Sequence, residues 1–572
     1  MDDPIVSPTV PSLILGLSAW SHDAAAALLV DGQLAATVEQ ERFSRRKRAM
    51  GEPPSDAARW CLDSVGAELE DVDVIALGVD HDLWRRWAQL SPEELATNRH
   101  PADPDWLFPP QLFHSRRTLK RPIRQVRHHL AHAASAYFPS GFEDAAIIVA
   151  DGSGEDASTT LYYARNGHLK ELTRFGVDLS LGYYYSRAAR YAGLWQSADE
   201  SGKLMGLAGY GRPGQVLPLS WRNGSPALEL PPMVSMTPRR LAEETRQKLT
   251  EYFRRHNFPF TEASEEGALA YADFAASVQR SLDEVMIELA RLAKRLTGSS
   301  NLVLAGGVAL NCSTNGKLAE SQIFERMFIP PAANDAGTAL GAAFVCAAET
   351  RSVGFEMVHA YWGPSYSAAA CRQALESSGL AYREVSDDQL LAEVVAHLAA
   401  GRIVGWFSGR AEIGPRALGA RSLLGDPRAR RTHVKLNQIK GREMWRPVAP
   451  SVLAENFFDY FEGPIPSPFM IVATNVRESM RKAIPAVVHV DGSARPQAVS
   501  AHANPKFWAL LKRFAETTGI PLLANTSFNI ETEPMVLQPA EAVRDFVNSN
   551  IDALALENFV VIKENAEGSS LP

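Results

Sequence analysis

The sequence predicts an α/β protein of two or three domains. The chain has 572 residues, whereas a single hydrophobic core stops growing at about 250–300 residues. Its composition, 46% hydrophobic and 22% charged, is that of an ordinary globular protein. A unit of apolar strands and polar turns appears twice before residue 173. Length, composition and this repeat together predict a multidomain protein whose first domain is internally duplicated.

Each copy of the repeat has a strand that leads into a polar loop, followed by two strands joined by a two-residue turn. The first copy occupies residues 13–39 and turns at Asp31-Gly32, and the second occupies residues 145–172 and turns at Asn166-Gly167. Two such hairpin units, with phosphates held between them, are the plan of the actin-like ATPase fold. We therefore expect that fold for the first domain, since internal repeats indicate architecture strongly.

The overall charge and the cysteine pattern restrict the class of partner. A net charge of −8 argues against broad nucleic-acid binding, so we expect small-molecule substrates and no nucleic acid. The four cysteines are scattered without a CxxC pair, which is typical of buried thiols in a reducing compartment. No apolar stretch is long enough for a bilayer and no signal peptide is visible, so we expect a cytoplasmic protein.

A candidate metal site is indicated by His128 and His132, which stand four residues apart. On a helix this spacing places both imidazoles on one face, where they can bind one transition-metal ion. Asp151 ends an apolar run before a glycine turn and is a candidate third ligand. Asp335 precedes a small-residue helix and is a candidate fourth ligand. The alternatives are incidental histidines on a surface helix and a plain helix N-cap at Asp335.

Two glycine-rich stretches are candidate phosphate or nucleotide contacts. Gly306 and Gly307 follow a strand and open a helix, a position where a ligand can approach the backbone. Residues 201–211 are dense in glycine and are expected to form a loop, with Lys203 as a possible phosphate contact. A flexible loop without a ligand is the alternative for this stretch.

Polar side chains around the first loop are candidates for acid–base chemistry. His22 and Asp23 follow the first strand, and Glu39 ends the third. The basic run 42–47 is more typical of a solvated face than of a phosphate site. Residues 80–125 are rich in Trp, Pro, Arg and His and are expected to cover the cleft.

A change of composition at residues 353–364 predicts a boundary between a first domain, 1–355, and a second, 356–572. The second domain carries arginines among Gly, Pro and apolar residues, and a strand that ends in amide and hydroxyl groups. Such groups are suited to binding a phosphate-bearing anion, with a solvated basic surface as the alternative. The candidates are Arg416, Lys440, Arg446, Arg495, Asn525 and Ser527.

Eight sequence runs, in the same order along nearly the whole chain, resemble the NodU/CmcH family of O-carbamoyltransferases. They follow the first-loop residues His22-Asp23 and are HHLAH, VADGSGE, LAGGVALN, NDAGTALGAA, GRAEIGPRALGARS, REMWRPVAPSV, SARPQ and NTSFN. The resemblance implies a TsaD-like actin-fold domain followed by a YrdC-like α/β domain. It also implies ATP and carbamoyl phosphate as substrates, use of Mg²⁺ with ATP, and a carbamoyl-adenylate made at the second domain. The carbamoyl group then passes to an acceptor hydroxyl, here that of an aminoglycoside, beside an iron(II) site.

The resemblance assigns roles to individual residues. The metal ligands it implies are His128, His132, Asp151 and Asp335, and Gly306, Gly307 and Asn311 match its nucleotide-facing loop. Gly152 and Lys203 are further candidates for nucleotide contact in the first domain. The six candidates of the second domain fall within the motifs that hold carbamoyl phosphate and ATP. His22 matches a first-loop histidine that can act as the base for the acceptor hydroxyl, oriented by Asp23 or Glu39. These two carboxylates can instead hold ammonium groups of the acceptor.

Three other functions compete with this interpretation. An actin-fold kinase would yield ADP and a phosphorylated acceptor, whereas the carbamoyl route yields AMP and pyrophosphate. A tRNA-modifying enzyme is disfavoured by the negative charge. A regulator without catalysis would leave two dense groups of polar side chains without a role.

Overall fold

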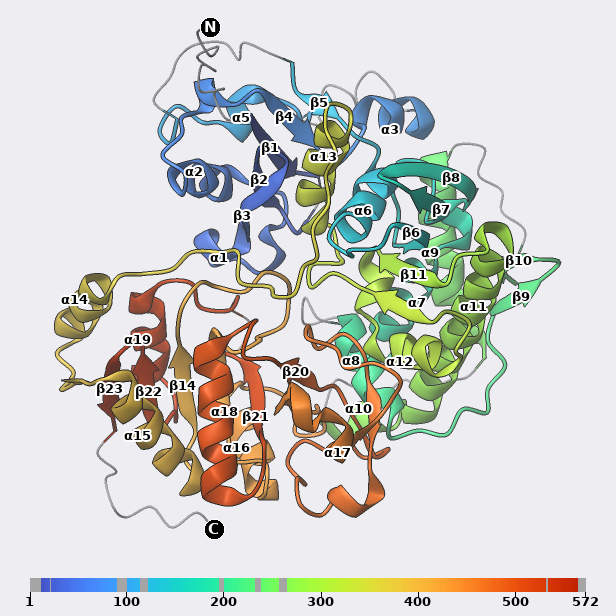
Figure 1. The fold of residues 1–572 in the computed structure, drawn as a ribbon. Coiled ribbons are helices and arrows are strands. Elements are labelled where there is room, and N and C mark those ends of the chain that lie inside the picture. Colours follow the sequence, from blue (N-terminus) through green and yellow to red (C-terminus); the bar gives the residue numbers. More distant parts are fainter. Residues whose placement is uncertain are drawn as a thin grey trace, which may run out of the picture.

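The computed structural model describes residues 12–20, 22–89, 100–113, 122–194, 200–231, 238–256, 265–530 and 533–563. Two five-stranded sheets fill the N-terminal part of the chain, and one large sheet lies in the C-terminal part (Figure 1). The predicted boundary at residue 355 falls between helices α13 (Gly337–Ala348) and α14 (Ala368–Ser378).

The first sheet has the strand order β3-β2-β1-β4-β5. Strands β4 and β5 run parallel to β1, whereas β2 is antiparallel to both of its neighbours. At the turn between β2 and β3, Asp31 and Gly32 have φ values of 51° and 79°, as a type I′ hairpin turn requires. The strands are β1 (Leu13–Ser18), β2 (Ala25–Val30), β3 (Gln33–Glu39), β4 (Val74–Leu77) and β5 (Arg124–Gln125).

The second sheet repeats this order as β8-β7-β6-β11-β12, with the same parallel and antiparallel pairs. Asn166 and Gly167, at the turn between β7 and β8, again both have positive φ. Two sheets of identical topology are the duplicated architecture of the actin-like ATPase fold, so the predicted fold of the first domain and its repeat are confirmed. The strands are β6 (Asp144–Ala150), β7 (Thr159–Arg165), β8 (His168–Phe175), β11 (Asn301–Ala305) and β12 (Arg326–Phe328).

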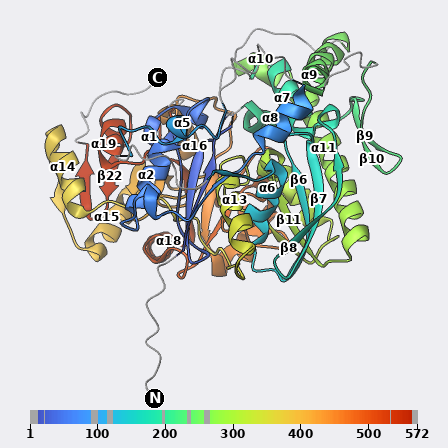
Figure 2. The same ribbon diagram turned by 90° about the horizontal axis from the view of Figure 1, so that it is seen from above.

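Two helices, α6 (His128–Tyr137) and α13, pack against each other between the two sheets (Figures 1 and 2). Each follows the last strand of its own sheet, so they occupy equivalent places in the two copies. Glycines allow the close packing: a Cβ on Gly341 would lie 1.7 Å from the carbonyl oxygen of Ala131, and one on Gly16 would lie 1.9 Å from that of Ala339. The small residues of the NDAGTALGAA run therefore bring α13 close to α6 and to β1.

The C-terminal part is an α/β domain built on a mixed eight-stranded sheet, as expected for a YrdC-like domain. Its strand order is β13-β23-β22-β14-β15-β21-β16-β20. Helices α14 and α19 (Pro539–Val547) pack together. Helices α15 (Asp387–Ala399) and α18 (Pro505–Thr518) form a separate pair whose apolar residues belong to another buried cluster. The strands are β13 (Arg383–Glu384), β14 (Val404–Phe407), β15 (Arg421–Gly425), β16 (Ala449–Leu453), β20 (Gln497–Val499), β21 (Leu522–Ser527), β22 (Ala553–Leu556) and β23 (Phe559–Ile562).

The remaining helices cover these sheets. In the first domain they include α2 (Ser55–Asp63), α3 (His81–Ala88), α7 (Leu181–Tyr191), α8 (Glu200–Ala208), α9 (Pro238–Arg255), α11 (Ala272–Thr297) and α12 (Cys312–Glu320). In the second they are α15 (Asp387–Ala399), α16 (Arg430–Ile439), α18 (Pro505–Thr518) and α19 (Pro539–Val547). Among the described residues, no helix has both the length and the apolar character needed to cross a bilayer.

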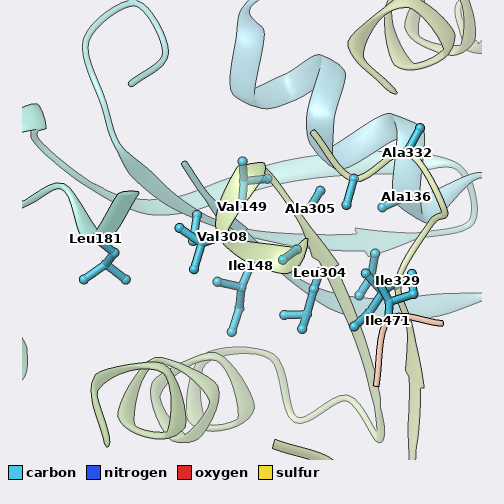
Figure 3. Close-up of a cluster of buried hydrophobic side chains, with 14 of the residues drawn as sticks. Ala136, Ile148, Val149, Leu181, Leu304, Ala305, Val308, Ile329, Ala332 and Ile471 are labelled. Carbon is cyan, nitrogen blue, oxygen red and sulfur yellow. The ribbon is translucent and has the colours of Figure 1, made fainter. Parts of the chain in front are cut away.

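The main hydrophobic core continues from the first domain into the second. Figure 3 shows Ile148 and Leu304, from the central strands of the second sheet, in one cluster with Ile329 and with Ile471 of the second domain. A hydrogen bond also links the two domains at this point: the side chain of Asn315 on α12 donates to the carbonyl oxygen of Ile471 at 2.7 Å. The two domains therefore share buried apolar surface.

The prediction of a loop at residues 201–211 is wrong for most of its length. Residues 200–208 form α8, which packs on α7 and α11. The glycines serve close packing in this helix: a Cβ on Gly206 would lie 3.3 Å from the ring of Pro447 in the second domain. Glycine is a poor helix former in isolation, and tertiary contacts override that preference here.

Candidate functional site

The four predicted metal ligands meet between the two sheets. His128 and His132 lie on the first two turns of α6, Asp151 directly follows β6, and Asp335 lies two residues before α13. Their ligand atoms all lie within 4.8 Å of one another. The N-cap alternative for Asp335 is wrong, because Ala336 is the N-cap of α13 and no side chain caps the helix.

The spacing of the four ligand atoms fits one divalent ion. The two Nε2 atoms are 3.1 Å apart, and each lies 3.3–3.6 Å from a carboxylate oxygen of Asp151 and of Asp335. A tetrahedral ion with ligands at about 2.0–2.2 Å would separate them by roughly 3.3–3.6 Å. Two imidazoles and two carboxylates suit Fe²⁺, Mn²⁺ or Zn²⁺.

Surrounding groups orient these ligands. The Nδ1 atom of His128 lies 3.0 Å from the carbonyl oxygen of Gly78, so Nδ1 carries the proton and Nε2 is left to bind an ion. One carboxylate oxygen of Asp151 accepts a hydrogen bond from the Gly307 amide at 3.1 Å. Burial opposes charge on His128, but Asp335 and Asp151 outweigh it and raise the pKa of the imidazole well above its usual value.

His22 lies beside this cluster, with its Nδ1 3.6 Å from Asp335 Oδ2 and 3.0 Å from Asp23 Oδ2. Arg48 contacts both residues: one of its nitrogens lies 3.1 Å from Asp23 Oδ2 and 3.0 Å from His22 Nδ1. Burial disfavours charge on His22, yet Asp335 and Asp23 together raise the pKa of its imidazole. Asp23 is therefore placed to orient His22, and Arg48 already compensates its charge.

Glu39 lies in a different environment from the one that the sequence indicated. Its carboxylate accepts a hydrogen bond from the amide of Gly414 and lies 3.6 Å from Arg42, which donates to the Gly414 carbonyl at 2.8 Å. Burial raises the pKa of Glu39, although Arg42 opposes this. No described contact joins Glu39 to His22, so Glu39 and Arg42 form a clamp on the loop that leads to Arg416.

The predicted nucleotide contacts of the first domain separate into two groups. Gly152 and Gly307 line the central cavity next to Asp151, and Asn311 lines it as well, whereas Gly306 packs on β6, where a Cβ would lie 2.3 Å from the carbonyl oxygen of Ala150. Asn311 caps α12: its side-chain oxygen accepts from the Thr314 amide at 3.0 Å. Lys203 is paired with Glu443 of the second domain, so its ammonium group joins the domains.

The six candidates of the second domain all line the same cavity. The ammonium of Lys440 donates to the backbone and hydroxyl oxygens of Ser527, each at 2.8 Å. Burial, together with nearby Arg442 and Lys47, lowers the pKa of Lys440 well below its usual value. Asn525 donates to the carbonyl oxygen of Ala417 at 3.2 Å, next to Arg416. Because these six residues line a cavity, the structure contradicts the alternative of a solvated basic surface.

One continuous cavity of about 910 Å³ connects both groups. On the first domain its wall includes His22, Asp151 and Asp335, and on the second it includes Arg416 and Arg495. The buried imidazoles of His128 and His132 lie behind the two aspartates and do not line the cavity. The arginine-lined pocket and the edge of the candidate metal site therefore belong to one cavity.

Several cavity residues were missed by reasoning from the sequence. Arg42 is buried, which contradicts the expected solvated face, and Arg48 lies beside His22. Arg187 on α7 and Arg246 on α9 also line the cavity, but single arginines on helices carry no motif that could have identified them. Trp84 and Trp87 lie in the wall as expected for part of residues 80–125, while residues 90–99 and 114–121 lie outside the described residues.

Comparison with protein families gives two matches. The family described as "Carbamoyltransferase N-terminus" matches residues 13–104 and 108–344, and "Carbamoyltransferase C-terminus" matches residues 395–563. The gap between the two matches contains the predicted domain boundary.

Individual proteins are similar over most of their length. An uncharacterised Synechocystis protein is 36% identical over 96% of both chains, and nodulation protein NolNO of Sinorhizobium fredii is 37% identical over 96% of this chain and 80% of its own. Nodulation protein U of the same species is 31% identical over 89% and 92%. The solved structure of full-length HypF covers 60% of this chain and 56% of its own, at 14% identity and a TM-score of 0.34.

Proposed function

The chain belongs to the NodU/CmcH family of carbamoyltransferases, and we propose that it is an ATP-dependent O-carbamoyltransferase. The observation that carries the proposal is the single cavity shared by the arginine-lined pocket of the second domain and the His/Asp cluster of the first. A reaction that makes an activated carbamoyl donor at one place and uses it at another needs such a connection.

The first step takes place beside the second-domain cations. Carbamoyl phosphate and water give carbamate and phosphate, and a carbamate oxygen then attacks the α-phosphorus of ATP, with pyrophosphate as the leaving group. The product is carbamoyl-adenylate. Arg416, Lys440, Arg446 and Arg495 supply positive charge for the phosphates, since guanidinium groups bind phosphate oxygens in pairs. The Mg²⁺ is bound to ATP and enters as part of that substrate.

The second step takes place beside His22. The acceptor hydroxyl attacks the carbamoyl carbon, AMP leaves, and a carbamate ester is formed. An alcohol is a weak nucleophile and needs a positioned base. His22 is the group proposed to take the proton, because it faces the cavity and Asp23, 3.0 Å from its Nδ1, orients the ring.

The four-residue cluster is the proposed metal centre. A divalent ion, iron(II) by the family resemblance, would be held by His128, His132, Asp151 and Asp335. Of these ligands, Asp151 and Asp335 line the cavity. Such an ion supplies Lewis-acid stabilisation of negative charge on phosphate oxygens. The backbone amide of Gly307 keeps the Asp151 carboxylate in place for this role.

The acceptor predicted from sequence is an aminoglycoside of the tobramycin or kanamycin type. Neither carboxylate that was expected to hold its ammonium groups is free for that purpose, because Asp23 pairs with Arg48 and Glu39 with Arg42.

Incubation with ATP and carbamoyl phosphate tests the reaction. Without an acceptor, the expected products are pyrophosphate, phosphate and carbamoyl-adenylate, formed only when both substrates are present, and hydrolysis of the adenylate by water then yields AMP and carbamate. With an acceptor, the product should gain the mass of one carbamoyl group. Formation of ADP and a phosphorylated acceptor would instead identify a kinase and refute the proposal.

A further inference from the structure

The end of the cavity around His22 has a distinctive set of side chains, and we call it the acceptor chamber. Tryptophans form part of its wall, and arginines from two helices form another part. Its members are Trp20, Arg48, Trp84, Trp87, Tyr183, Arg187, Arg190, Glu200 and Arg246.

Ring contacts connect the aromatic part of the wall to the candidate metal centre. The ring of Trp20 lies 5.4 Å from that of His128 and 6.1 Å from that of Trp84 on α3. Helix α3 packs on α9, which carries Arg246. The Arg246 guanidinium lies 5.0 Å from the centre of the Tyr183 ring on α7. The wall therefore runs continuously from the metal ligands to the arginines.

The arginines of the wall are connected to His22 through Glu200 and Arg48. On α7, Arg190 forms an ion pair of 3.0 Å with Glu200. Burial disfavours charge on Arg48, yet Asp23 chiefly, with smaller help from Asp335 and Glu200, raises its pKa; Glu200 is thus near Arg48 as well. Since Arg48 contacts His22, the chamber surrounds the proposed base.

The chamber carries excess positive charge. Arg48 pairs with Asp23, and Arg190 pairs with Glu200, which leaves Arg187 and Arg246 as chamber arginines with no ion pair to any described residue. Within the described ranges, no hydrogen bond or ion pair is formed by the guanidinium of Arg187. Burial lowers the pKa of Arg187, and the like charges of Arg190 and Arg246 lower it further. An anion placed among these groups would relieve their repulsion.

We propose that the acceptor alcohol carries an anionic group, a phosphate or a carboxylate, which Arg187 and Arg246 bind while the tryptophans contact the acceptor's ring. This inference rests on the proposed O-carbamoyltransferase function and names the substrate class for it. Guanidinium groups bind both anions in the same planar way. A polycation such as an aminoglycoside would meet the like charges of Arg187 and Arg246 beside the proposed base, so the structure favours a different acceptor class from the one predicted by sequence.

The test compares acceptors that differ only in charge. Glucose, glucuronate, glucose 6-phosphate, glucosamine and tobramycin are titrated by calorimetry into the full-length protein, whose second-domain anion pocket is filled with a nonhydrolysable ATP analogue. We expect glucuronate or glucose 6-phosphate to bind at least about tenfold more tightly than glucose, since a hydrogen bond to a charged group contributes about ten- to hundredfold in affinity. Glucosamine and tobramycin should bind more weakly than glucose.

Variants assign the preference to the chamber. Arg187→Ala should reduce the affinity ratio of anionic to neutral sugar by about tenfold, and Arg187→Lys should retain most of it. Arg280→Ala, a half-exposed arginine of α11 outside the cavity, is the matched control and should keep the wild-type ratio. Equal affinities for glucose and the anionic sugars, or a higher affinity for tobramycin than for glucose, would overturn the inference.

A parallel measurement separates this inference from the proposed function. AMP formation without an acceptor depends on the second domain, so its absence in the wild type would refute the function and not the acceptor class. If the two arginines served the adenylate phosphate instead, Arg187→Ala would slow AMP formation and leave the sugar affinity ratio unchanged, and that result would also overturn the inference.

Discussion

Substitution of Gly341 by alanine tests how the fold positions the candidate metal centre. The added Cβ would lie 1.7 Å from the carbonyl oxygen of Ala131, where an ordinary contact needs 3.4 Å. Ala131 lies on α6 between His128 and His132, and Gly341 lies one and a half turns into the helix that follows Asp335. Helices α6 and α13 would have to separate by about 1.7 Å at this point.

Both stability and metal binding should respond. Forcing extra volume into a packed interface typically costs about 1–3 kcal/mol of unfolding free energy. Ligand distances in metal sites tolerate only about 0.2 Å of error, so we expect metal affinity to fall by at least about tenfold, as it does when the supports of a metal site are disturbed. The measurements are metal content after dialysis against a buffered chelator, and urea unfolding of the same samples.

Gly214→Ala is the matched control, because no atom lies within 4 Å of the position of its added Cβ and its φ is not positive. That variant should bind metal and unfold like the wild type. Wild-type metal content and an unchanged unfolding midpoint in Gly341→Ala would show that the close contact between α6 and α13 does not control the site.

The other predictions address the division of labour and the buried charges. His132→Ala should lose bound metal and acceptor carbamoylation while still forming AMP from ATP and carbamoyl phosphate; loss of AMP formation as well would contradict separate sites. Arg495→Ala should abolish AMP formation and keep the metal, as read by nucleotide chromatography and elemental analysis, and metal loss would count against it. Arg42→Ala should lower the unfolding free energy by about 3–5 kcal/mol, because it leaves the buried Glu39 carboxylate without its cation; a wild-type urea midpoint would contradict this. Burial raises the pKa of Asp283 to about 6, above its unfolded value of about 3.9, so the stability that its proton contributes is present below the lower value and is lost as pH rises to 6. Asp283→Asn should flatten that decline in urea unfolding at pH 4, 5 and 6, and an identical slope in both proteins would exclude Asp283 as its source.

Sequence patterns predicted the parts of the fold that local chemistry determines. The Asp31-Gly32 and Asn166-Gly167 turns each need two residues with positive φ, and few residue pairs other than Asp-Gly and Asn-Gly provide this. The spacing of His128 and His132 on a helix similarly follows from the helical period. These signals lie within a few residues of each other, so one sequence is sufficient to find them.

Other predictions failed because contacts between distant segments decided the outcome. Lys203 has the composition of a phosphate-binding loop around it, but Glu443, 240 residues away, pairs with its ammonium group. Glu39 ends a strand near His22, yet Gly414 and Arg42 bind its carboxylate. Arg187 and Arg246 lie on ordinary helices, and only the packing of α7 and α9 brings them into one chamber.

The clamp formed by Glu39 and Arg42 on Gly414 has a consequence for how this chain can be divided. Gly414 has a φ of 87°, and a side chain there would collide with Pro331, so the first domain shapes the loop on which Arg416 stands. A fragment of residues 356–572, even if well folded, would present that arginine on an unsupported loop. We therefore expect the C-terminal fragment to make no adenylate alone, and recombining separately expressed halves to restore it only when their shared interface reforms.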